Sequence, residues 1–153
     1  MNKKILFLSL MIINLSTYSQ IFKDKYIMDA TKVAEIWMNN INSSKYAIAY
    51  NQYSDQVKEN SDSIYWSKAI TQLMDEFGEI VSREIISSEF KSNIENLGDG
   101  FYVFIEYKSV YKKINECSEY LLLGQDDNIK WKILRYDFSY ISEDQDLDEK
   151  SSN

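Results

Sequence analysis

The spacing of apolar residues changes at Gly78, and this change constrains the fold more than any other feature of the sequence. Upstream of it, apolar residues recur every three or four positions, which predicts amphipathic helices. Gly78 is a natural helix end, because glycine adopts a positive φ without a steric penalty. Ser44 can cap a helix by accepting a bond from its exposed amides. Three helices are therefore expected at residues 28–41, 44–53 and 60–77.

Downstream of this glycine, apolar and polar residues alternate, as they do in antiparallel strands with one buried face. In the second such stretch, Tyr107 lies on the apolar face and Glu106 on the other. Turn-forming stretches at 98–100 and 125–128 are short enough to make neighbouring strands antiparallel. The predicted strands are 79–90, 101–111, 118–125 and 130–138.

These elements predict an α+β domain in which three N-terminal helices pack on a curved, cone-like, four-stranded antiparallel sheet. The chain has 153 residues, which is enough for one domain of this kind but not for two. We place the domain at residues 20–141. Trp37, Trp66 and Trp131 fit the inward faces of their elements and are expected in its core.

The N-terminus has the features of a secretory signal. Lys3 and Lys4 precede a largely apolar run at residues 5–13, and small residues ending in Ser19 precede a cleavage point. The alternative is an uncleaved membrane anchor, but the run is shorter than the ~20 residues that a spanning helix needs. We expect residues 1–19 to be a cleaved signal peptide, and the mature chain to be periplasmic or secreted, without a membrane span.

The C-terminal stretch, residues 142–153, is rich in acidic residues and contains Lys150 as its one basic residue. It has almost nothing to bury, so a disordered acidic tail is expected. The alternative, a calcium site, lacks the central glycine and the distal glutamate of an EF-hand loop.

Charge and residue types exclude several classes of function. The chain carries a formal net charge of −7, so nucleic acid is not an expected partner. It has no histidine, which excludes Ser-His-Asp and Cys-His catalysis and most transition-metal sites. Cys117 is the only cysteine and is expected to be a small, half-buried strand residue. We therefore predict no metal and no cofactor.

The strands also carry charged and phenolic residues that could form a polar site. An acid beside tyrosines, in a pocket between helices and sheet, could transfer a proton as a small isomerase or hydrolase does. Alternatively, the charges form cross-strand pairs or face solvent, and we favour this interpretation. Arg83 and Glu119 are expected to pair, because each has apolar neighbours on its face of the strand and an unpaired charge there is costly. The candidates are Arg83, Glu106, Tyr107, Glu119, Arg135 and Tyr136.

An ordered set of residues along the domain resembles a known family. The set consists of Trp37, Tyr46, Gly78, Ser82, Arg83, Asp99, Gly100, Tyr102, Val103, Glu119, Trp131 and Tyr136. Over about residues 32–140 it resembles a bacterial family called domain of unknown function 4019. That family commonly has glycine where this chain has Ile129 and Arg135. The Arg135 side chain leaves less room for another group to approach the last strand closely.

The resemblance implies a small exported or envelope protein without an established activity. The element order is also similar to the nuclear transport factor 2-like superfamily, a likeness of layout that implies no activity. We therefore expect a non-catalytic binding or interaction module of a bacterial envelope, with the proton-transfer enzyme as the alternative. An acidic, tyrosine-rich domain with an open sheet suits a protein or peptide partner, or a homodimer. Its expected binding residues are Arg83, Glu106, Glu119 and Tyr136.

Overall fold

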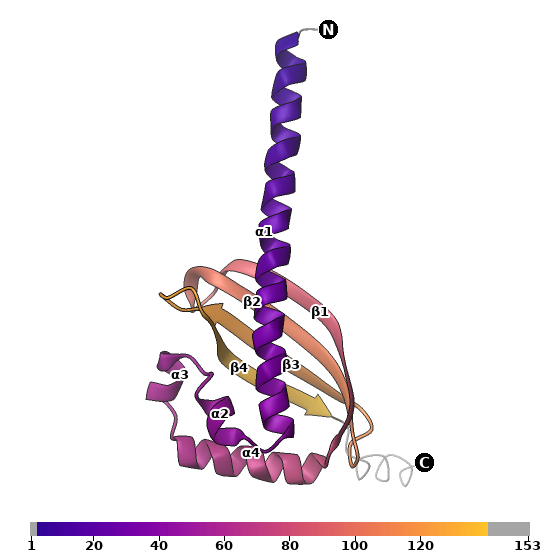
Figure 1. The fold of residues 1–153 in the computed structure, drawn as a ribbon, viewed down its shortest axis with the longest axis vertical. Helices are drawn as coiled ribbons and strands as arrows, with labels where there is room; N and C mark the ends of the chain where they lie inside the picture. The colour runs from indigo at the N-terminus through magenta and orange to yellow at the C-terminus, as the bar shows by residue number, and fades with distance from the viewer. Residues whose placement is uncertain (1–2, 141–153) are drawn as a thin grey trace, which may run out of the picture.

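The computed structural model describes residues 3–140, and it describes side chains for residues 20–140. Within this range the helices precede the strands (Figure 1), which confirms the α+β class. The elements are α1 (Lys3–Asn42), α2 (Tyr46–Tyr50), α3 (Asp55–Glu59), α4 (Ser63–Phe77), β1 (Ile80–Ile94), β2 (Gly98–Tyr111), β3 (Cys117–Gln125) and β4 (Trp131–Tyr140).

The long helix α1 crosses one face of the sheet (Figure 1). It begins well before the predicted stretch 28–41 and ends one residue later, at Asn42. Its buried residues run from Ala30 at spacings of three and four and include Trp37, as expected of an amphipathic helix. Trp37 Nε1 donates a 3.1 Å hydrogen bond to the carbonyl oxygen of Ala49, which fixes α1 against α2.

The predicted terminal segments remain predictions. The proposed cleavage point after Ser19 lies within α1, and the proposed tail at residues 142–153 lies outside the described residues. None of the described helices combines the length and apolar character needed to cross a membrane.

The short helices correct two predictions. Ser44 does not cap α2: the N-cap residue is Lys45, no side chain caps it, and Ser44 has a φ of 55°. Helix α3 was not predicted; its N-cap Ser54 accepts a hydrogen bond from the amide of Val57. The described chain therefore has four helices rather than the three expected.

Helix α4 confirms the third predicted helix, although it starts later than residue 60. Its N-cap Asp62 accepts hydrogen bonds from the amides of Ile64 and Tyr65. Its C-cap Gly78 has a φ of 76°, the left-handed conformation that glycine adopts at low cost. The change of period at Gly78 therefore marks the actual end of the helical half.

The four strands form one antiparallel sheet in the order β1-β2-β3-β4, as expected. The turn predicted at 125–128 lies between β3 and β4. The turn predicted at 98–100 is misplaced, because it lies at residues 95–97 and β2 starts at Gly98. Asn96 and Gly98 supply the positive φ values of this hairpin, 72° and 82°.

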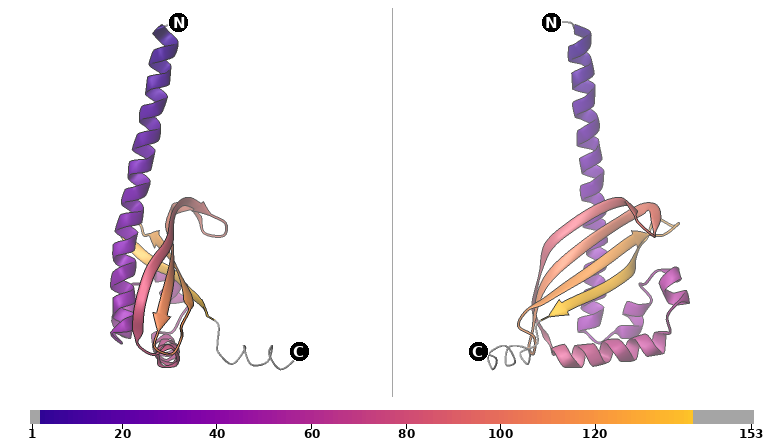
Figure 2. Two further views of the ribbon diagram at one scale, coloured as in Figure 1. Left: turned by 90° about the vertical axis from the view of Figure 1, so that its right-hand side faces the viewer. Right: turned by 180° about the vertical axis from the view of Figure 1, so that it is seen from behind.

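The two faces of the sheet differ. Helix α1 covers one face and α4 lies along one end, while no described element covers the opposite face (Figure 2). We call these the inner face and the open face. Because β1 is the first strand of the sheet, one of its edges has no neighbouring strand within the described chain. The register of β1 against β2 shifts at three places, where bulges alter the course of the strand.

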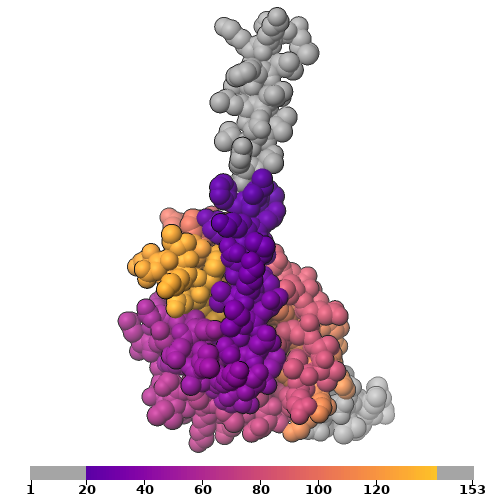
Figure 3. Space-filling view, viewed as in Figure 1, coloured from indigo at the N-terminus to yellow at the C-terminus, as the bar shows by residue number. Residues whose placement is uncertain are grey.

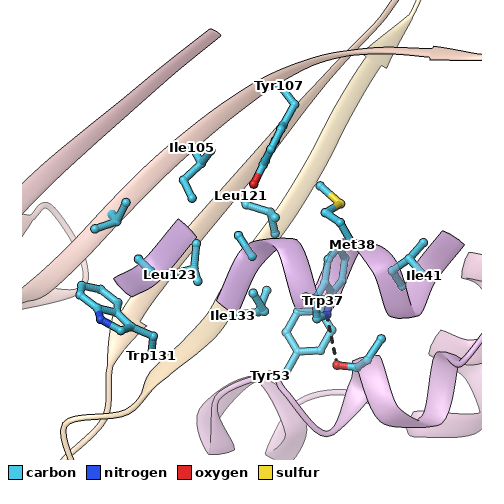
Figure 4. Close-up of a cluster of buried hydrophobic side chains, with 14 of the residues drawn as sticks. Trp37, Met38, Ile41, Tyr53, Ile105, Tyr107, Leu121, Leu123, Trp131 and Ile133 are labelled. Carbon is cyan, nitrogen blue, oxygen red and sulfur yellow. Dashed lines mark hydrogen bonds between the residues drawn. The ribbon is translucent and has the colours of Figure 1, made fainter. Parts of the chain in front are cut away.

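The main core lies between α1 and the inner face of the sheet (Figure 4). The Trp37 ring lies 5.9 Å from Tyr53 and 5.1 Å from Tyr136, between ring centroids. Trp37 and Trp131 are buried as predicted, whereas Trp66 is half-buried. A second, smaller core beside α4 consists of Phe77, Tyr111, Ile114 and Cys117.

Candidate functional site

A polar cluster on the inner face is centred on Glu119 of β3. Glu119 stands opposite Tyr107 of β2, and Arg83 of β1 stands opposite Ser109 of β2. Residues two apart on a strand point to the same face, so this register brings Arg83 and Glu119 together on the inner face. The Glu119 side chain is 0% exposed and that of Arg83 is 11% exposed.

Arg83 and Glu119 form a two-point ion pair, which confirms the predicted pair. Arg83 Nε lies 2.8 Å from Glu119 Oε2, and Arg83 Nη2 lies 3.1 Å from Glu119 Oε1. This geometry uses one side of the guanidinium, so Nη1 takes no part in the pair.

Three hydroxyl groups complete the surroundings of the carboxylate. Tyr111 and Tyr136 donate hydrogen bonds of 2.9 and 2.6 Å to Glu119 Oε1, and Ser109 donates to Oε2. With the two bonds from Arg83, Glu119 accepts five hydrogen bonds. A carboxylate has about four lone-pair sites, so its accepting capacity is used up. We call these five residues the Glu119 cluster.

Electrostatics keep the hydroxyls of the cluster protonated. Burial, and then the charge of Glu119, raises the pKa of Tyr111 and holds the pKa of Tyr136 well above its ordinary value. Burial by itself lowers the pKa of Arg83, but the charge and hydrogen bonding of Glu119, together with Tyr111 and Tyr136, outweigh this and the pKa is raised. At neutral pH the cluster therefore consists of a guanidinium facing a carboxylate, surrounded by neutral hydroxyls.

Beside the cluster, a groove of about 450 Å³ lies between α1 and β1. The two elements run side by side along this seam, as Figure 3 shows. Glu35, Asn39 and Asn42 of α1 are exposed there, and their spacing of four and three residues places them on one helix face. The rest of the lining consists of Met38, Ile80, Arg83, Ile85 and Tyr107.

Tyr107 lines this groove and carries a polar group that has no partner among the described residues. Its side chain extends from β2 toward α1 near Met38 (Figure 4), and the residue is 3% exposed. Its hydroxyl is buried and has no hydrogen-bond partner among the described residues. Burial raises the pKa of Tyr107 to about 12, although the charge of Arg83 opposes this. An unpaired buried hydroxyl costs ~1–3 kcal/mol, so the protein keeps this group at a cost in stability.

The structure brings together three of the four predicted binding residues. Arg83, Glu119 and Tyr136 meet in the Glu119 cluster. Glu106 does not join them, because it alternates with Tyr107 and lies on the open face. There it accepts a 3.1 Å hydrogen bond from Ser87.

The other residues of the cluster and of the groove wall were not predicted. Ser109 had a detectable signal, because it places a hydroxyl on a strand face that is otherwise apolar. Glu35, Asn39 and Asn42 also had one, in the polar spacing of a single helix face. Tyr111 had none, since a tyrosine on an apolar face also fits the core.

Ile129 and Arg135, which stand where the resembled family commonly has glycine, lie away from the Glu119 cluster. Ile129, in the turn between β3 and β4, has a φ of 62°, a conformation that is costly for a β-branched residue. Arg135 lies on the open face, where its side chain is 69% exposed and pairs with Asp137.

The central acid of the site, Glu119, is fully hydrogen-bonded, whereas the carboxylate of Glu35 in the groove is exposed. Within residues 20–140, no cluster of three or more acidic, cysteine or histidine side chains could hold a metal ion. The groove combines apolar side chains with amides, a carboxylate and a phenol, which suits the binding of a molecule that is partly apolar and partly polar.

The fold and the site define a small α+β domain with a buried ion pair in its sheet and a polar groove beside that pair. The chain belongs to the family described as Protein of unknown function (DUF4019), whose model matches residues 33–136. This range includes the whole Glu119 cluster and every residue that lines the groove. Comparison with curated proteins found no match to the chain.

Proposed function

We propose that this protein is a non-catalytic binding module exported to the bacterial envelope, and that its ligand site is the groove between α1 and β1. The observation that carries this proposal is a contrast between neighbouring groups. The Glu119 carboxylate is saturated by hydrogen bonds from its own chain, whereas the Tyr107 hydroxyl beside it has no partner. The unmet hydrogen-bonding capacity is therefore a buried hydroxyl in the wall of the groove.

The state of the candidate acid–base groups supports binding over catalysis. A general base must reach a substrate proton with a free lone pair, but Glu119 is fully buried and its lone pairs are taken. The raised pKa values of Tyr111 and Tyr136 keep these phenols protonated near neutral pH. Glu106, the other candidate acid, lies on the open face, away from these tyrosines.

Export is supported by the N-terminal sequence. Lys3 and Lys4, the apolar run at 5–13 and the small residues before Gln20 together fit a secretory signal. Cleavage there would leave α1 with the residues that pack on the sheet, since its buried stripe starts at Ala30. The mature module would then act outside the cytoplasm.

We also propose that the sheet has the curved form of the nuclear transport factor 2-like layout, with the groove on its concave side. The register shifts in β1 and β4 support a bent sheet. This likeness concerns architecture and carries no activity.

The proposal is tested by photo-crosslinking in the bacterium that makes the protein. The photoreactive residue p-benzoylphenylalanine replaces Asn39 in the groove, and in a matched control it replaces Arg135 on the open face. We expect a crosslinked product, recovered from the envelope or the medium, for the Asn39 position and not for the Arg135 position. No product at Asn39, or equal products at both positions, would refute the groove as the binding site.

A further inference from the structure

We propose that the groove takes an extended segment of a partner polypeptide, which adds as a strand beside β1 and carries a basic side chain toward Glu35. This inference rests on the proposed function, because it names the ligand class of the same site. Four features of the α1–β1 seam support it.

The first feature is the free edge of β1. The strand is 15 residues long, and its outer edge has no neighbouring strand in the part of the chain that the structure describes. An unpaired edge presents a row of main-chain donors and acceptors to another extended chain. Between two register shifts, residues 82–85 pair regularly with β2, so this stretch keeps the regular backbone that strand addition needs.

The second feature is the apolar surface that this edge strand exposes. Val81, Ile85 and Ile86 of β1 are 62%, 43% and 55% exposed. Natural edge strands are commonly blunted by lysine or proline, but β1 has its first lysine only at Lys91, and the chain contains no proline. An added strand would cover this apolar surface.

The third feature is the wall that α1 forms beside this edge. Asn39 and Asn42 expose carboxamides, which can donate to and accept from a peptide main chain or a polar side chain. A second hollow of about 290 Å³ shares Asn42 and Ile80 with the groove and reaches Gly78. Two adjoining hollows suit an extended chain better than a compact small molecule.

The fourth feature is charge. Glu35 lines the groove and forms no ion pair within residues 20–140, whereas the charge of Arg83 is balanced by Glu119. The groove therefore offers an unbalanced negative charge, on a chain whose net charge is itself negative. A basic side chain on the added segment is complementary to it.

The test uses the purified full-length protein and three fluorescein-labelled octapeptides. The first alternates lysine and valine, the second alternates glutamate and valine, and the third is the lysine peptide with methylated valine amides. We expect saturable binding of the first by fluorescence anisotropy, and binding about tenfold weaker or less for the other two. Bound peptide should also slow hydrogen exchange of the β1 amides.

Matched variants separate this site from general attraction between charges. Glu35→Lys should weaken binding of the lysine peptide about tenfold, while the same change on the open face, Glu106→Lys, should leave it within about twofold. Equal binding of all three peptides, or no effect of Glu35→Lys, would overturn the inference. So would a dimer in sedimentation that Ile85→Lys dissociates, because the edge would then belong to a second copy.

The outcomes also separate this inference from the proposed function. If the Asn39 position crosslinks in cells but none of the peptides binds, the groove binds a ligand and only the polypeptide is wrong. If the Asn39 position gives no crosslink, the proposed function fails as well.

Discussion

Replacing Arg83 by methionine tests whether the Glu119 cluster holds the sheet together. Methionine keeps an apolar stem of similar length but removes the cation and its two hydrogen bonds to Glu119. The carboxylate, at 0% exposure, would then be a buried charge without a cation. Removing one partner of a buried ion pair costs ~3–5 kcal/mol. We expect Arg83→Met to lower the free energy of unfolding by about that amount, a large share of the ~5–15 kcal/mol typical of a protein domain.

The double variant Arg83→Met/Glu119→Leu should recover part of this loss. It removes the uncompensated charge, but it also leaves the hydroxyls of Ser109, Tyr111 and Tyr136 without their acceptor. Each buried hydroxyl that stays unpaired costs ~1–3 kcal/mol, so recovery cannot be complete. We expect the double variant to unfold with a free energy ~1–2 kcal/mol above that of Arg83→Met, a recovery limited by those hydroxyls.

Urea denaturation followed by tryptophan fluorescence measures these values, and the m-values check that the variants unfold in one transition. The matched control is Arg135→Met, because the Arg135 side chain is 69% exposed and its loss should change stability by no more than ~0.5 kcal/mol. The predicted pair is refuted if the losses in free energy of unfolding of Arg83→Met and Glu119→Leu, measured singly, add to that of the double variant within ~0.5 kcal/mol. It is also refuted if Arg83→Met lowers the free energy of unfolding no more than Arg135→Met does.

Three further predictions concern strained, unpaired or buried groups. Ile129→Gly should raise the free energy of unfolding by ~1 kcal/mol, because Ile129 has a φ of 62° and is 75% exposed; a loss of stability in urea denaturation would contradict this. Tyr107→Phe should stabilise the unliganded protein by ~1 kcal/mol, since it removes a buried hydroxyl without a partner, and an unchanged or lower urea midpoint would contradict this. Burial raises the pKa of Tyr53 and Tyr107 to about 12 from 10.0, so their contribution to stability is present below about pH 10 and is lost as the pH rises through about 12. A titration of phenolate absorbance in which all tyrosines ionise together near pH 10 would be inconsistent with this.

The sheet was predictable because its signals are local. Alternation over ten or more residues identifies a strand and its buried face at once. It placed Glu119 on an apolar face, where an unpaired charge is costly. The position of a turn depends on which residue adopts a positive φ. Gly98 and Gly100 suggested a turn between them, yet the reversal uses the positive φ of Asn96 and places both glycines in β2.

The helical half was less predictable because its short elements depend on tertiary contacts. Helix α3 spans five residues and buries none of them fully, so it has too few apolar positions to show a period. Ser44 has the chemistry of an N-cap but takes a left-handed conformation between α1 and α2, and α2 starts without any side-chain cap. Helix α2 is held by packing against α1 and α4 instead of by local sequence signals.

The groove could not be predicted, because it arises from two elements far apart in the sequence. Glu35 and Asn39 of α1 meet Arg83 and Ile85 of β1 only after α1 has crossed the sheet. The hydroxyl of Tyr111 was not predicted for another reason. Tyr111 also packs as an aromatic side chain against Phe77, so its spacing does not distinguish a hydrogen-bond donor from a core residue.

The contact between Trp37 and Tyr136 joins the first element of the domain to the last, with ring centroids 5.1 Å apart. A chain is synthesised from its N-terminus, so the apolar stripe of α1 is made long before the strand that covers it. Until β4 emerges, Trp37 has no complete surface to bury against, and contacts of such sequence separation form slowly. A chain cut before Trp131 should therefore stay unfolded and open to proteases, whatever the helical propensity of its first half.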